Sequence, residues 1–243
     1  MNRAMYAAAS GMAAQQAHLD VVANNLANAD VIGFKGSVAT FSELAVPGSG
    51  GIGTAQSGAQ PSFTPGKLAK TGGPFDVAID GPGFFAVMNG EGATALTRNG
   101  EFSRAPDGKL YNAPGWHLAS IKIPADATHA SVDPDGRVWI NRTRHARACI
   151  GRIRIADVAS PEHLESLGSA LWRPTKTSGA IAYRAPGSQG APPIAFGMLE
   201  RSNVSIVEAM MEILAAQRSY EANAKGVQAA DEMQRIANNL HRG

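Results

Sequence analysis

The two ends of the chain share one spacing of apolar positions. Near the C-terminus, a run of apolar or small residues with one glutamine comprises Ile206, Met210, Ile213, Gln217, Tyr220, Ala224 and Val227. Near the N-terminus, the corresponding residues are Met5, Ala9, Met12, Gln16, Leu19, Ala23 and Leu26. Steps of four and three residues alternate in both series, as along the a/d seam of a coiled coil. The pattern predicts a long helix at each end. The candidate assembly-interface residues are Met5, Met12, Leu19, Leu26, Ile206, Met210, Ile213, Tyr220 and Val227.

Local signals place the ends of both predicted helices. The first should run from about residue 2 to Asn28, because asparagine tolerates the left-handed conformation of a C-cap. Ser205 with Glu208 three residues later forms a capping box at the start of the second helix. A helix of about 35 residues is roughly 50 Å long, which exceeds what one small domain needs. We therefore expect the terminal helices to pair as a coiled coil; the alternative is two independent amphipathic helices lying on a globular core.

The middle of the chain changes to strand periodicity. Residues 75–79 and 84–88 are predicted strands separated by an Asp-Gly-Pro-Gly turn. Asn99-Gly100, Asp107-Gly108 and Asp135-Gly136 are hairpin signals, and residues 148–157 alternate as one strand. A last strand is expected over residues 194–200. The predicted fold class is α+β, with a central mostly-β domain inserted between two long terminal helices.

This reading divides the chain into three parts. Residues 1–34 and 202–243 would form the terminal-helix domain, and residues 76–201 a β-rich outer domain. Residues 35–75 are predicted as an extended linker, because the stretch 47–62 is rich in Gly, Ser and Pro and has little to bury. The outer faces of the helices are rich in Ala, Asn and Gln, which suggests that further copies of the helices cover them.

Composition narrows the function classes. The 243 residues carry a net charge of +2 and a single cysteine, so an internal disulfide and a multi-cysteine zinc site are excluded. No apolar run is long enough for a transmembrane helix. The N-terminus lacks the basic and apolar regions of a cleaved signal peptide.

No catalytic or cofactor motif is complete. The Gly81-Pro82-Gly83 stretch lacks the third glycine of a dinucleotide-binding fingerprint, and a strand follows it. Asp133 and Asp135 resemble the start of a calcium loop, but Arg137 stands where a third oxygen ligand belongs. We therefore expect no enzyme, no metal and no cofactor; a hydrolase with an unrecognised pair of carboxylates stays open as a weaker alternative.

A basic cluster lies in the β-rich part. Its arginines are Arg137, Arg142, Arg144, Arg147, Arg152 and Arg154. Only Trp139 is interleaved with them, which disfavours nucleic-acid binding. The favoured interpretation is a solvated hairpin, and the alternative is an electrostatic contact with a neighbouring subunit or an acidic polymer. Cys149 within the cluster is read as a small strand residue, with a reactive thiol as the alternative.

Several motifs, in order along the chain, carry a family resemblance. They are VVANNLANADVIGFKGS near the start, DVAIDGPGFFAV and LTRNGEF in the middle, and MLERSNVSIVEAMMEILAAQRSYEANAKGVQAADEM near the end. With these motifs the chain resembles the bacterial flagellar rod proteins over nearly its whole length. The motif residues carried over are Asn24, Asn25, Asn28, Gly33, Phe34, Gly81, Gly83, Phe84 and Phe85. The stretch before Gly33 departs from the family pattern, which puts the local turn in doubt.

The resemblance implies a structural subunit of the rod, the drive shaft of the basal body. It implies polymerisation with itself and with other rod and hook subunits, export by the flagellar type III apparatus without a cleaved signal peptide, and a periplasmic place in the basal body. Within the family, the short stretch between Phe41 and Phe63 favours the proximal rod protein FlgF over the distal rod protein FlgG. The alternative from another class is a secreted β-domain binding module that its terminal helices oligomerise.

Overall fold

The computed structural model describes the whole chain except residues 1–2, 47–49, 143–146, 189 and 241–243. The chain divides into two units. The helical unit comprises Met1–Ala29, Ser37–Ser62 and Val204–Gly243, and the β unit comprises Asp30–Gly36 and Phe63–Asn203. The chain therefore passes between the units four times.

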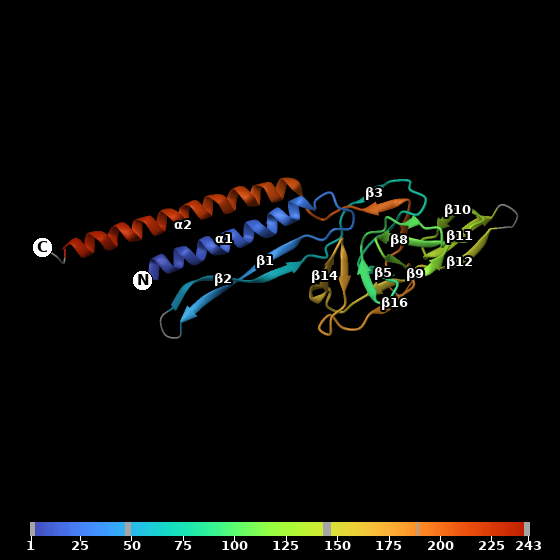
Figure 1. The fold of residues 1–243 in the computed structure, drawn as a ribbon, viewed down its shortest axis with the longest axis horizontal. Coiled ribbons are helices and arrows are strands. Elements are labelled where there is room, and N and C mark those ends of the chain that lie inside the picture. Colours follow the sequence, from blue (N-terminus) through green and yellow to red (C-terminus); the bar gives the residue numbers. More distant parts are fainter. Residues whose placement is uncertain (1–2, 47–49, 143–146, 189, 241–243) are drawn as a thin grey trace. The chain divides into compact units, whose positions relative to one another are not determined.

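The helical unit contains two long helices and a two-stranded ribbon. Helix α1 spans Arg3–Ala27, strand β1 Ser37–Val46, strand β2 Gly50–Pro61 and helix α2 Ile206–Leu240. Helices α1 and α2 lie side by side and run antiparallel, since Gly11 meets Asn223 while Ala8 meets Gly226 (Figure 1). The Ser205 hydroxyl accepts the Glu208 N–H at 3.4 Å, as the capping box predicts.

Strands β1 and β2 occupy much of the stretch that was expected to be an extended linker. They pair antiparallel, with Ser37 opposite Pro61 and Thr40 opposite Gly58. An isolated two-stranded ribbon is marginal in water, and this one packs against α1. The Ser10 hydroxyl of α1 accepts the Thr54 N–H at 3.2 Å. The small side chains that were taken as linker composition allow this close packing.

The β unit is built from short strands. Their bounds are β3 Leu68–Lys70, β4 Val77–Ile79, β5 Phe84–Met88, β6 Thr94–Thr97, β7 Ser103–Arg104, β8 Lys109–Ala113, β9 Trp116–Lys122, β10 Ala127–Val132, β11 Arg137–Arg142, β12 Ala148–Arg152, β13 Ile155–Asp157, β14 Glu165–Gly168, β15 Leu171–Arg173, β16 Ala182–Arg184, β17 Ile194–Phe196 and β18 Met198–Glu200, with a 3₁₀ turn at Pro161–His163. One sheet follows the order β14-β15-β6-β5-β9-β8-β7, and β13 joins it between β5 and β16. Strands β10, β11 and β12 form a second sheet, and β17-β4 and β18-β3 form two short pairs.

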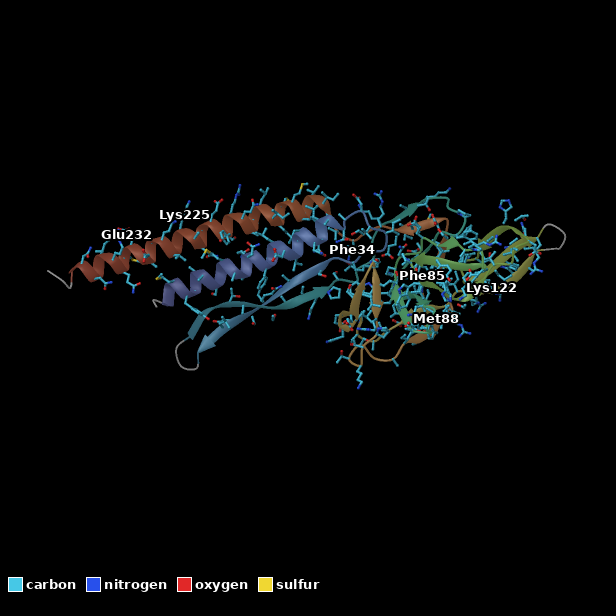
Figure 2. All side chains as sticks on the ribbon, in the orientation of Figure 1. Phe34, Phe85, Met88, Lys122, Lys225 and Glu232 are labelled. Atoms are coloured by element: carbon cyan, nitrogen blue, oxygen red, sulfur yellow. The ribbon has the colours of Figure 1, made fainter. Side chains whose placement is uncertain are left out.

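Strand β5 lies at the centre of this unit because both of its faces are buried. Phe85 and Val87 join the larger apolar cluster, together with the side chain of Phe102. Phe84 and Ala86 belong to a second cluster on the opposite face. Figure 2 places Phe85 inside the unit. A strand that is buried on both faces explains the unbroken apolar run of this segment.

Three sequence predictions in the β unit were wrong in detail. The strands flanking Asn99-Gly100 do not form a hairpin, because β6 pairs with β5 and β15 while β7 pairs with β8. The predicted strand over residues 148–157 is two strands in different sheets, β12 and β13. The predicted strand over residues 194–200 is divided at Gly197, whose φ is 69°. The hairpins at Asp107-Gly108 and Asp135-Gly136 are confirmed.

Neither helix of the described chain contains an apolar stretch of the length needed to cross a bilayer.

Candidate assembly site

The contact between α1 and α2 is built from small residues. Over residues 206–236 of α2, the buried positions are Ala209, Ala216 and Ala230, at 4%, 3% and 2% exposure. They recur every seven or fourteen residues, which keeps them on one stripe of the helix. A Cβ on Gly11 would lie 2.8 Å from the Asn223 amide nitrogen, so the two helices approach closely there.

The predicted interface residues of α2 divide between two faces. Ile213 and Val227 are half-buried, whereas Ile206, Met210 and Tyr220 are exposed. The stripe that faces α1 therefore passes through the alanines next to the larger predicted residues. Close approach of the backbones favours alanine over methionine at these positions.

The predicted residues of α1 are all partly buried. They are Met5, Met12, Leu19 and Leu26. Within residues 5–27 of this helix, the most buried apolar side chains are instead Ala14 and Val22, at 6% and 2% exposure. Helix α1 has neighbours on two sides, since it contacts both α2 and the β1–β2 ribbon.

A face of α2 leaves large apolar side chains in solvent. We call the five residues in its first turns the α2 apolar patch; they are Ile206 at 42%, Val207 at 68%, Met210 at 53%, Met211 at 58% and Leu214 at 56% exposure. Met233 and Ile236 are exposed further along. Figure 2 shows the Lys225 and Glu232 side chains projecting from the same helix. A contiguous exposed apolar surface of this kind marks an interaction site.

The asparagines of the N-terminal motif fix the end of α1. The Asn25 side chain donates to the Ser37 carbonyl at 2.7 Å and accepts the Ser37 N–H at 2.8 Å. The Asn28 amide group donates to the Asn24 carbonyl at 2.8 Å and thereby satisfies a helix-end carbonyl. These bonds hold the start of β1 against the end of α1.

The glycines of the motifs permit close packing in the β unit. Gly33 has φ +68°, and a Cβ there would lie 2.4 Å from the Asn99 nitrogen. A Cβ on Gly83 would lie 2.3 Å from Ile155, and one on Gly81 would lie 2.6 Å from Pro192. Phe34 beside Gly33 is half-buried. Phe84 and Phe85 belong to the two apolar clusters already described.

Three charged side chains that the sequence analysis missed form a buried cluster in the β unit. The Lys35 ammonium lies 2.7 Å from one Glu200 oxygen, and the Arg98 Nε lies 3.3 Å from the other. All three residues are no more than 2% exposed. We call this group the junction cluster. The sequence signal that could have identified this cluster is a charged residue at the end of an apolar strand pattern, which occurs at Arg98 and at Glu200.

The junction cluster gathers the segments that lie next to the crossings between the units. The Lys35 ammonium also donates to the Thr64 carbonyl at 2.7 Å, and the Gly66 N–H donates to Glu200 at 2.8 Å. The Asn203 side chain accepts the Gly36 N–H at 2.8 Å. Residues 33–36, 64–66 and 200–203 are thus fastened to one another within the β unit.

Electrostatics in the junction cluster depend on Glu200. Burial lowers the pKa of Lys35 below its ordinary value, and the hydrogen bond and attraction of Glu200 oppose this shift. Burial likewise lowers the pKa of Arg98, again opposed by Glu200. One carboxylate therefore compensates two buried cations, and removing it would leave both uncompensated.

The basic cluster is largely paired. Arg137 and Arg152 contact Asp135 at 3.1 and 3.3 Å, Arg142 contacts Asp126 at 3.6 Å, and Arg147 contacts Asp133 at 3.6 Å. Arg144 lies outside the described residues. Asp133 also accepts the Trp139 indole N–H at 2.7 Å, and the side chain of Cys149 is exposed. Within the described ranges, no three or more His, Cys, Asp or Glu side chains are grouped to hold a metal ion.

Comparison with known proteins gives matches along the whole chain. Residues 5–35 match the family described as flagella basal body rod protein, residues 78–140 the flagellar hook protein FlgE/F/G D1 domain, and residues 196–240 the flagellar basal body rod FlgEFG protein C-terminal region. The flagellar basal-body rod protein FlgG of Borreliella burgdorferi is 36% identical and that of Bacillus subtilis 33%, each over 100% of both chains. The flagellar basal-body rod protein FlgF of Caulobacter vibrioides is 32% identical over 98% of this chain and 97% of its own. These identities do not favour the expected preference for FlgF over FlgG.

Proposed function

The chain belongs to the family of flagellar basal-body rod proteins, and from this premise we propose that it polymerises through its terminal helices. It is a structural subunit of the flagellar basal body. The helical unit would form the axial part of the polymer, and the β unit the outer part.

The observation that supports polymerisation is the α2 apolar patch. Its five side chains remain about half exposed although α1 already covers another face of the same helix. Burying the remaining surface contributes roughly 1 kcal/mol for each side chain. One such contact is weak, but subunits that meet head to tail repeat it without closure and extend a filament.

We further propose that α1 and α2 form a coiled coil in the assembled rod. The four–three spacing of the candidate residues in both helices supports this geometry. The candidate interface residues Met5, Met12, Leu19 and Leu26 would serve contacts within and between copies. On α2, Ile213 and Val227 would serve the pairing with α1, and Ile206, Met210 and Tyr220 the contacts between copies.

The proposed mechanical role depends on stiffness. A shaft transmits torque only if its subunits do not yield where the chain changes unit. The junction cluster fastens the chain segments next to those crossings by ionic and backbone bonds. We expect the junction cluster to resist local unfolding of these segments, because unfolding would separate its buried ion pairs and leave each charge without its partner.

The route to the rod is also a proposal. We propose that the chain is a substrate of the flagellar type III export apparatus, that it occupies the periplasmic part of the basal body, and that other rod and hook subunits are its neighbours. The family membership supports all three statements.

The test replaces Met211 and Leu214 together by Asp in a strain that lacks the natural gene. Both side chains project into solvent, so the variant should fold and be exported at the normal level. It should fail to enter purified basal bodies, because burying a carboxylate without a partner is costly. The matched control is Gln228→Asp, which is exposed on the same helix. Incorporation of the double variant at the level of the control would contradict the proposal.

A further inference from the structure

A groove of about 740 Å³ lies on the β unit. Its apolar lining includes the buried side chains of Ala86 and Leu118. The polar side chains that line it are Ser120, Arg152, Arg154 and Tyr183. They come from β9, from the end of β12 and the link that follows it, and from β16, strands that Figure 1 shows in one region of the unit.

The groove exists because β5 changes partner along one edge. Phe85 pairs with Ile155 of β13, whereas Val87 pairs with Leu118 of β9. Ala86 lies between these pairs and is matched only across the other edge, with Leu96. Strands β9 and β13 therefore diverge from β5 at Ala86 and leave a wedge between them.

Two arginines that line the groove lie next to the link between β12 and β13. The chain crosses from β12 to β13 through Ile153, which is buried and donates its N–H to the Gly136 carbonyl at 2.8 Å. Arg152 and Arg154 on either side of it line the groove. Because the alternation of an extended chain places both side chains opposite Ile153, the two guanidinium groups share one side.

The charge of the groove's lining residues is positive and incompletely balanced. Asp135 is shared between Arg137 and Arg152. Across the described part of the chain, Arg154 makes no ion pair. None of the groove's lining residues is acidic, and all four of its polar side chains can donate hydrogen bonds. The groove therefore selects a ligand that is anionic and rich in acceptors.

We propose that this groove binds an extended acidic peptide segment of a partner protein. Carboxylates of the segment accept hydrogen bonds from Arg152 and Arg154, and its backbone runs along the wedge between β9 and β13, beside β16. The divided pairing of β5 favours a peptide, because β9 pairs with β5 only at His117 and Leu118, and the next residue, Ala119, lines the groove without a paired strand on that edge. Tyr183, which is 48% exposed, covers the segment from the side of β16.

The test uses the full chain and a fluorescent peptide of about six residues in which Glu and Ala alternate, the length of one added strand. Binding is followed by fluorescence anisotropy at low salt and near neutral pH. The peptide should bind, and Arg154→Gln should weaken it about tenfold, because charge-assisted hydrogen bonds to the carboxylate are lost. Arg152→Gln should act in the same direction.

Matched controls keep the test specific. Arg142→Gln changes an arginine of the same basic cluster that does not line the groove, and it should alter affinity by less than about twofold. A peptide with Gln in place of Glu should not bind. Absence of binding, or binding that is indifferent to Arg154→Gln, would overturn the proposal. Tighter, Arg154-dependent binding of a uronic-acid oligosaccharide would overturn the assignment to a peptide.

Discussion

Replacing Glu200 by Gln tests whether the junction cluster stabilises the β unit. The substitution keeps an acceptor for the Gly66 N–H but removes the only charge that compensates Lys35 and Arg98 within the cluster. Breaking a buried pair in this way costs about 3–5 kcal/mol, because an uncompensated buried charge remains. Two cations are affected here, so we expect the upper half of that range.

Lys35→Met should cost clearly less. It removes one of the two cations, and Glu200 keeps the Arg98 guanidinium and the Gly66 N–H. The loss is then mainly the hydrogen bond to the Thr64 carbonyl, about 1–2 kcal/mol. Glu165→Gln breaks the exposed ion pair with Arg173 and is the surface control, at less than about 1 kcal/mol.

Urea unfolding followed by tryptophan fluorescence measures these differences, since all three tryptophans of the chain lie in the β unit. A loss of 4 kcal/mol corresponds to a fall of about 2 M in the midpoint at a slope near 2 kcal/mol per M. The reasoning would be refuted if Glu200→Gln cost no more than Glu165→Gln. It would also be refuted if Lys35→Met cost as much as Glu200→Gln.

Three further results are expected. Gly33→Ala should lower the free energy of unfolding of the β unit by about 1–3 kcal/mol in the same urea assay, because the new Cβ meets the Asn99 backbone. Gly115 also has a positive φ (+80°), but a Cβ there would meet no atom within 4 Å, so Gly115→Ala should cost less. Equal losses for the two variants would contradict the reasoning. Asn25→Ala should speed hydrogen exchange of the Ser37 amide by removing its acceptor, with a loss of about 1–3 kcal/mol; unchanged exchange would count against it. Partial burial, together with the charge of Lys109, lowers the pKa of His117 in the folded protein. As the pH falls below 6.5, the unfolded chain therefore binds a proton at this side chain before the folded chain does, and the stability of the β unit should decrease with decreasing pH. His117→Gln should flatten that part of the stability profile, and an unchanged slope would show that His117 is not its cause.

The helices were predictable because their signal is local. A four–three spacing and a capping box lie within short windows of sequence, and α1 and α2 follow them to within two residues. The face of α2 that meets α1 was harder to predict from the sequence. Sequence patterns weight large apolar residues, whereas close helix packing here uses Ala209, Ala216 and Ala230.

Features that depend on distant partners were missed. The β1–β2 ribbon has the composition of a loop and is stabilised by α1, for example at Ser10 and Thr54. Asn99-Gly100 has the sequence of a hairpin turn, but Val77 donates its N–H to the Gly100 carbonyl, and the strands on either side pair with other strands. Lys35 and Glu200 are 165 residues apart, and no local pattern connects them.

The most direct test of polymerisation through α2 is the reactivity of one thiol on the α2 apolar patch. Met211→Cys in a Cys149→Ser background places the only thiol at a side chain that is 58% exposed. We predict fast alkylation in the free chain, close to the rate in denaturant, and at least about tenfold slower alkylation in purified basal bodies. Equal alkylation rates in the free and assembled protein would contradict the account.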